Sequence, residues 1–95
     1  MAAVKPKMRE GLTVVELDGE AVVYDEASGD LHHLNHTASL VFGLCDGTGT
    51  ARALSEDLSQ VFGVPLPEME PQVRRLLREL RKAGLLAPSR NGSRA

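Results

Sequence analysis

The strongest constraint on the fold is the Asp18-Gly19 pair, which separates two runs rich in β-branched residues, 12–17 and 20–25. A two-residue type I′ turn needs positive φ at both central positions, and Asp-Gly supplies it. The sequence therefore predicts a β-hairpin. Its expected cross-strand pairs are Leu17–Glu20, Val15–Val22 and Thr13–Tyr24. Both faces of this ribbon carry apolar residues, so the sequence leaves open which face meets the core.

A second turn, at residues 26–30, leads into a short apolar and histidine run, Leu31 to Leu34. We expect this run to be the third strand of an antiparallel meander. Because it is the last strand of the meander, it lies at an edge of the sheet. An edge strand leaves one row of backbone N–H and C=O groups unpaired.

Three helices are predicted after the strands, from capping residues and apolar spacing. Asn35 begins an apolar helix over 36–45, and Thr50 begins a second helix that ends at Gly63. In this second helix Leu54, Leu58, Val61 and Phe62 form the apolar stripe, whereas Ser55, Glu56, Asp57, Ser59 and Gln60 are expected to face water. The third helix is predicted with Pro71 in or near its first turn and Gly84 at its end. Its apolar face comprises Met69, Val73, Leu76, Leu77 and Leu80.

The chain of 95 residues is long enough for one small domain with one core. We expect a flexible arm over 1–10, the folded domain over 11–87 and a disordered tail over 88–95. The single cysteine, Cys45, cannot form an intramolecular disulfide, which is typical of a reducing compartment. No segment has the pattern of a signal peptide or of a membrane span, so a cytoplasmic protein is expected.

No arrangement of residues typical of catalysis is found, and we predict neither an enzyme nor a cofactor. Cys45 has apolar neighbours and no adjacent base, so it is interpreted as a small core residue. His32 and His33 are consecutive on a strand and therefore point to opposite faces, which argues against a shared metal ion. No metal site is predicted.

Charge is distributed unevenly along the chain, although the net charge is only −2. Residues 10–51 include eight acidic residues and no Lys or Arg, whereas residues 72–95 include seven basic residues and one acidic residue. Such asymmetry bears on the choice of partners. An acidic first half and a basic last helix could hold a ligand of mixed charge between them.

Several short segments together resemble the PqqD family, whose members are the RiPP recognition elements, also called peptide chaperones. The resemblance covers roughly residues 11–87. It is carried by Leu34-Asn35 followed by Thr37-Ala38, by Leu44-Cys45-Asp46-Gly47, and by Val73, Leu77, Leu80 and Ala83-Gly84-Leu85-Leu86 in order. The resemblance implies a winged-helix-like α+β fold, with a three-stranded antiparallel sheet followed by three helices.

The resemblance also implies a non-catalytic adaptor. Such a domain binds the leader segment of a ribosomally made precursor peptide as an extra strand, and presents it to a modifying enzyme such as a radical SAM or an ATP-dependent enzyme. The unpaired edge at 31–34 independently fits β-strand addition. The expected peptide-binding residues are Asp30, Leu31, His32, His33, Leu34, Val73, Arg74, Leu77, Arg78 and Arg81. The arginines on the third helix could equally be a solvated helix face.

The alternative function is that of a winged-helix DNA-binding protein, because the second and third helices could form a helix-turn-helix. Arg74, Arg75, Arg78 and Arg81 would then contact DNA. The negative net charge and the acidic hairpin argue against this alternative, because a DNA-binding wing is usually basic. No membrane partner is expected, and binding to nucleic acid is disfavoured.

Overall fold

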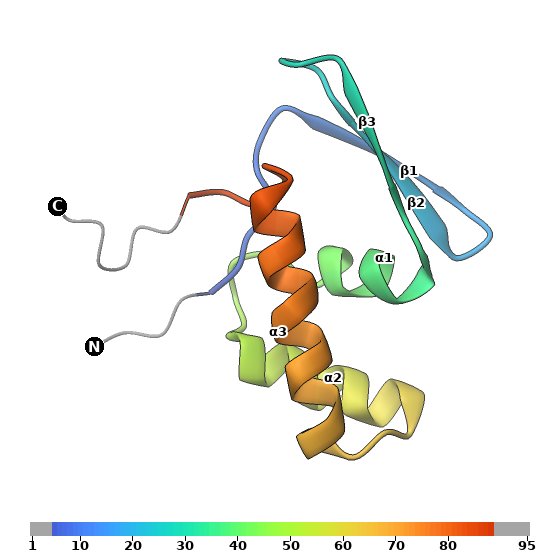
Figure 1. The fold of residues 1–95 in the computed structure, drawn as a ribbon, viewed down its shortest axis with the longest axis vertical. Helices are drawn as coiled ribbons and strands as arrows, with labels where there is room; N and C mark the ends of the chain where they lie inside the picture. Colours follow the sequence, from blue (N-terminus) through green and yellow to red (C-terminus); the bar gives the residue numbers. More distant parts are fainter. Residues whose placement is uncertain (1–4, 89–95) are drawn as a thin grey trace, which may run out of the picture.

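The computed structural model describes residues 5–88 and confirms an α+β fold of three antiparallel strands followed by three helices (Figure 1). The elements are β1 (Leu12–Leu17), β2 (Glu20–Asp25), β3 (Asp30–Leu34), α1 (His36–Gly43), α2 (Ala51–Phe62) and α3 (Leu66–Lys82). In Figure 1 the C-terminal end of α3 lies beside the sheet, whereas its N-terminal end packs with α2. The open, winged-helix-like arrangement is the one predicted.

The hairpin adopts the predicted turn and register. Asp18 and Gly19 both have positive φ, 53° and 80°, and the strands pair as expected, including Val15 with Val22. The structure also settles which face of the ribbon is buried, since Ala21 and Val23 are almost fully inaccessible. The opposite face remains exposed and carries Val15, Leu17, Tyr24 and Leu31.

The core lies between the inner face of the sheet and the three helices, with α3 at its centre. Val23 from the sheet, Val41 from α1, Leu58 from α2 and Val73 from α3 are all fully buried. After α3 the chain folds back, so that the Leu85-Leu86 pair is buried as well. This single cluster is the only apolar core among the residues described.

Predicted capping residues occupy the expected helix ends. The Asn35 side chain accepts a hydrogen bond from the backbone N–H of Ala38, and Gly63 ends α2 in the left-handed conformation. α3, however, begins earlier than predicted, at Leu66, so Pro71 lies in its second turn. Pro71 has no N–H to donate to the carbonyl of Pro67, so one helical hydrogen bond is missing there.

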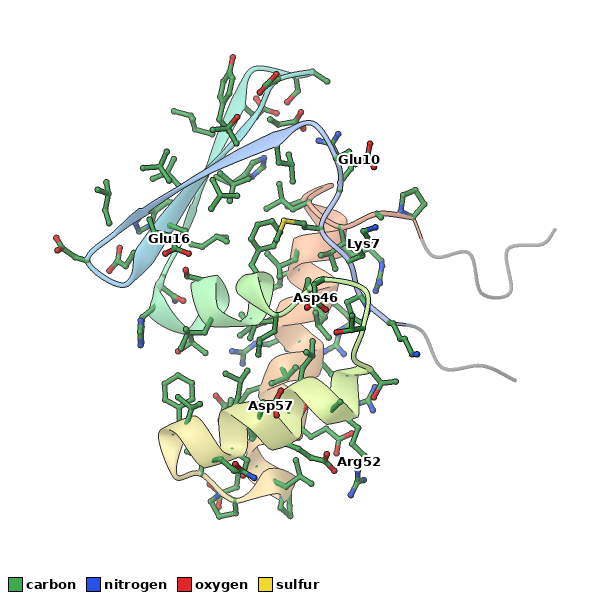
Figure 2. The ribbon with its side chains drawn as sticks, turned by 180° about the vertical axis from the view of Figure 1, so that it is seen from behind. Lys7, Glu10, Glu16, Asp46, Arg52 and Asp57 are labelled. Atoms are coloured by element: carbon green, nitrogen blue, oxygen red, sulfur yellow. The ribbon has the colours of Figure 1, made fainter. Side chains whose placement is uncertain are left out.

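The segment before β1 is bonded to the domain in the structure. The N–H of Met8 donates to the carbonyl of Cys45 (2.8 Å), and the N–H of Ala87 donates to the carbonyl of Lys7 (2.7 Å). Figure 2 shows Lys7 close to Asp46, with which its backbone forms an isolated β-bridge. The expected arm over 1–10 thus includes residues that bond to both the α1–α2 connection and the chain after α3. Residues 1–4 of that arm, and 89–95 of the expected tail, lie outside the described residues.

No helix in the described part of the chain is long and apolar enough to cross a membrane.

Candidate binding groove

The sheet has the order β1-β2-β3, so β3 is an edge strand among the described residues. The hydrogen-bonding pattern of the β1–β2 hairpin determines which backbone N–H and C=O groups of β3 point away from the sheet. In an antiparallel pair, residues alternate between hydrogen-bonded and non-hydrogen-bonded positions, and the pair next to a two-residue turn is hydrogen-bonded. That pair is Leu17–Glu20, and the bond from Glu26 N–H to the Gly11 carbonyl has the same parity.

The alternation then assigns the backbone groups of β3. Because Ala21 and Val23 are non-hydrogen-bonded toward β1, they bond their partners on β3, Leu34 and His32. The N–H and C=O groups of the intervening residues, Leu31 and His33, therefore point away from the sheet. Outside the strand ladders, the described hydrogen bonds do not involve the backbone of either residue.

A groove of about 460 Å³ runs beside this free edge. One wall is formed by residues 31–34 of β3, and the other wall by the C-terminal half of α3 together with the chain that follows it. The α3 wall and its continuation comprise Leu76, Glu79, Leu80, Ala83 and Leu85. An extended chain paired with β3 would lie along this groove.

The groove is mostly apolar on its floor and polar at its rim. Leu76, Leu80 and Leu85 are each less than 10% exposed and form the floor. Glu79 is exposed at the rim, where its carboxylate lies 3.8 Å from Arg75. His32 is half-buried on the strand opposite. This arrangement suits an extended chain that places apolar side chains on the side facing α3.

Comparison with known proteins identifies the family of the chain. The family model "Coenzyme PQQ synthesis protein D (PqqD)" matches residues 20–86, more than two thirds of the chain. The chain belongs to the PqqD family. No curated protein sequence matches it.

Two solved structures share the fold of this PqqD-family chain. One, described as TbiB1 in complex with the TbiA(beta) leader peptide, is 21% identical and has a TM-score of 0.75; the match covers 84% of this chain and 93% of that one. The other, lasso peptide synthetase B1 complexed with the leader peptide, is 23% identical and has a TM-score of 0.76; the match covers 88% and 99%. At this identity the likeness shows the fold.

The structure divides the expected peptide-binding residues between three places. Residues 30–34 form β3, and four of them line the groove beside its edge. Val73 is fully buried in the core. Arg74, Leu77, Arg78 and Arg81 line a separate groove, together with Pro6, Thr50, Ala51 and Arg52. With 3.6 residues per turn, these α3 residues lie on the flank of the helix opposite to the α3 residues that line the groove beside β3.

Sequence reasoning missed Leu76, Glu79, Leu80 and Ala83 as residues beside β3. The sequence does show that these four residues share one helix face, because residues three and four apart on a helix are neighbours. The sequence places Leu76 and Leu80 on the apolar face of the helix but does not say which border of that face approaches β3. Only the packing of α3 against the sheet distinguishes the two borders.

Cys45 belongs to the core, and His33 contacts Glu20 on the outer face of the sheet. Cys45 is completely buried, and its Sγ donates to the Val41 carbonyl (3.2 Å). Burial raises the pKa of the Cys45 thiol to about 12, so the thiol is protonated at neutral pH. His33 pairs with Glu20 across the outer face (2.7 Å). Among residues 5–88, no three His, Cys, Asp or Glu side chains gather as metal ligands do.

Proposed function

We propose that this PqqD-family chain is a non-catalytic adaptor that binds the leader segment of a ribosomally made precursor peptide. The observation that carries the proposal is the unpaired edge of β3, which lies beside a groove with an apolar floor and a polar rim. Unpaired backbone groups alone would favour indiscriminate pairing. An adjoining groove with both apolar and polar lining residues adds side-chain selection, and the two together are the requirements for β-strand addition.

In the proposed complex the leader is a fourth strand. The outward N–H and C=O groups of Leu31 and His33 supply up to four backbone hydrogen bonds. Alternate side chains of the leader then enter the groove, over Leu76 and Leu80, while the others lie on the exposed outer face near Leu31. Backbone pairing would contribute affinity, and the groove would contribute selectivity.

The proposed site therefore keeps residues 30–34 and takes its helical wall from the β3-facing flank of α3. It comprises Asp30, Leu31, His32, His33, Leu34, Leu76, Glu79, Leu80 and Ala83. Arg74, Leu77, Arg78 and Arg81 fall outside it, because they line the groove on the other flank. Val73 contributes to the core beneath the site.

The adaptor role implies a second partner, an enzyme that modifies the bound precursor. A radical SAM or an ATP-dependent enzyme is the proposed class, and the cytoplasm, where ribosomes make the precursor, is the proposed location. The chain's one thiol is unsuited to nucleophilic catalysis, because burial keeps it protonated. The leader peptides in the two structural relatives support the choice of ligand.

The proposal is tested by calorimetric titration with a synthetic leader peptide from the precursor gene nearest to this chain's gene. We expect saturable binding that Ala83→Phe weakens at least about tenfold, because the larger side chain occupies the groove. Ala27→Phe is the matched control, since Ala27 is exposed in the β2–β3 turn and lies outside the groove. Absence of binding to the wild-type domain, or equal affinity of Ala83→Phe and wild type, would contradict the proposal.

A further inference from the structure

The groove on the other flank of α3 is lined by four arginines. It has a volume of about 440 Å³ and lies between α3, the first turn of α2 and Pro6. The arginines are Arg52 from α2 and Arg74, Arg78 and Arg81 from α3. All four are exposed, whereas Pro6 and Leu77 beneath them are buried. The groove thus combines a cationic rim with an apolar floor.

Two of these arginines lack an ion pair within the described part of the chain. Arg52 pairs with Glu56 (3.3 Å) and Arg74 with Glu70 (2.7 Å), each one turn away on the same helix. Arg78 and Arg81 form no ion pair among residues 5–88. Exposed pairs of this kind are weak and exchange readily with a new carboxylate. The groove therefore offers two free guanidinium groups and two that could be recruited.

The first turn of α2 adds to the positive potential. This turn contains no acidic residue, although the helix dipole would stabilise one at this end of the helix. Arg52 lies there instead. Figure 2 shows Arg52 projecting from α2, away from the body of the domain. A cation at a helix N-terminus is locally unfavourable. Its position at the rim of a groove that already holds three arginines is consistent with a role in binding.

We propose that this arginine groove docks an acidic segment of the modifying enzyme while the groove beside β3 holds the leader. This inference rests on the proposed adaptor function. Because the two grooves lie on opposite flanks of α3, a peptide in one leaves the other open. Arginine can bind a carboxylate through two parallel hydrogen bonds, which suits Asp and Glu side chains on a protein partner.

The surroundings of the groove favour an acidic polypeptide over nucleic acid. The hairpin carries Glu16 and Asp18, which would repel a phosphate backbone lying along the domain. The apolar floor, by contrast, suits the side chains that accompany acidic residues in a protein segment.

The test compares Arg78→Glu with Lys82→Glu. Both residues are exposed on α3 and one turn apart, and both substitutions change the net charge equally, but Lys82 lines neither groove. Each full-length variant is titrated with the synthetic leader peptide, with the purified enzyme encoded beside the precursor gene, and with a short DNA duplex. Arg78→Lys, which keeps the charge and loses the paired donors, is measured as well.

We expect Arg78→Glu to weaken binding to the enzyme at least about tenfold, and Arg78→Lys to weaken it less. Lys82→Glu should stay within about twofold of wild type, and leader affinity should be unchanged in all three variants. Binding of wild type to the enzyme should also fall as salt concentration rises.

Other outcomes overturn the inference in distinguishable ways. Loss of leader affinity in Arg78→Glu would assign the arginines to the leader, and duplex binding that is lost in Arg78→Glu would assign them to nucleic acid. Equal enzyme affinity in Arg78→Glu and Lys82→Glu would show a nonspecific charge effect. If wild type binds the leader but not the enzyme, this inference alone fails. If wild type binds no leader, the adaptor function itself fails.

Discussion

Replacing His33 with proline removes one of the outward N–H groups of β3 and changes little else in the sheet. The His33 N–H points away from β2, so no ladder hydrogen bond is lost. Proline is tolerated on edge strands for this reason. We therefore expect His33→Pro to fold and to bind the leader peptide more weakly.

The expected magnitude follows from the number of bonds lost. A backbone hydrogen bond contributes about 1 kcal/mol net, which corresponds to about a fivefold rise in Kd at 25 °C. The proline ring also occupies part of the space in which the guest strand would lie. Fivefold is thus a lower bound. The measurement is calorimetric titration of the folded variant with the synthetic leader peptide.

Two control variants separate the backbone effect from other causes. His33→Ala keeps the N–H but removes the imidazole and its exposed pair with Glu20, which should alter affinity little. Glu16→Pro makes the same backbone change at an outward position of β1, the opposite edge of the sheet. If Glu16→Pro weakens binding as much as His33→Pro does, or if His33→Pro binds as wild type, strand addition at β3 is refuted.

Further predictions concern the stability of the domain. Leu77→Ala should lower the free energy of unfolding by about 2–5 kcal/mol in urea titrations, because the Leu77 side chain is 5% exposed; a loss below about 1 kcal/mol would show that this site repacks. Its exposed neighbour is the matched control, and Arg78→Glu should stay within about 0.5 kcal/mol of wild type. The hydrogen bond from Arg9 lowers the pKa of Asp25 below its ordinary value of 3.8. A lowered folded-state pKa gives stability that is present above that ordinary value and is lost as the pH falls through the folded pKa. The difference in Tm between wild type and Asp25→Asn should accordingly shrink as the pH falls below about 4, and a difference independent of pH would contradict this assignment.

Local sequence signals determined most of the fold. The Asp18-Gly19 turn fixed the register of β1 and β2, and Asn35, Thr50 and Gly63 marked helix ends because each satisfies a specific backbone requirement. These signals act within a few residues and are independent of distant packing. They are therefore readable from a single sequence.

Tertiary packing decided what the sequence could not. Ser55 was expected to face water but is fully buried, with its hydroxyl donating to the Ala51 carbonyl (2.7 Å). Val61 was expected in the buried stripe but is 68% exposed. Periodicity gives the face that residues share, but not how far a neighbouring helix covers that face. α3 packs along one border of the α2 stripe and leaves the other border exposed.

In the candidate site, too, local signals predicted one part and tertiary packing decided the other. The free edge of β3 could be predicted because a meander must end on an edge strand. The helical wall beside it could not, because the broad apolar stripe of α3 has two borders and either of them could approach β3. Leu76 and Leu80 lie toward β3, whereas Leu77 lies toward the arginines. The sequence contains no local signal that says which of these borders meets β3.

Hydrogen exchange of individual backbone amides, followed by NMR with and without the synthetic leader peptide, tests the central claim most directly. The claim predicts that the amides of Leu31 and His33 exchange rapidly in the free domain and become protected when the peptide binds. His32, already bonded within the sheet, should be protected in both states. Protection gained instead at Val14 and Glu16 of β1, or no change at Leu31 and His33 on saturation, would contradict it.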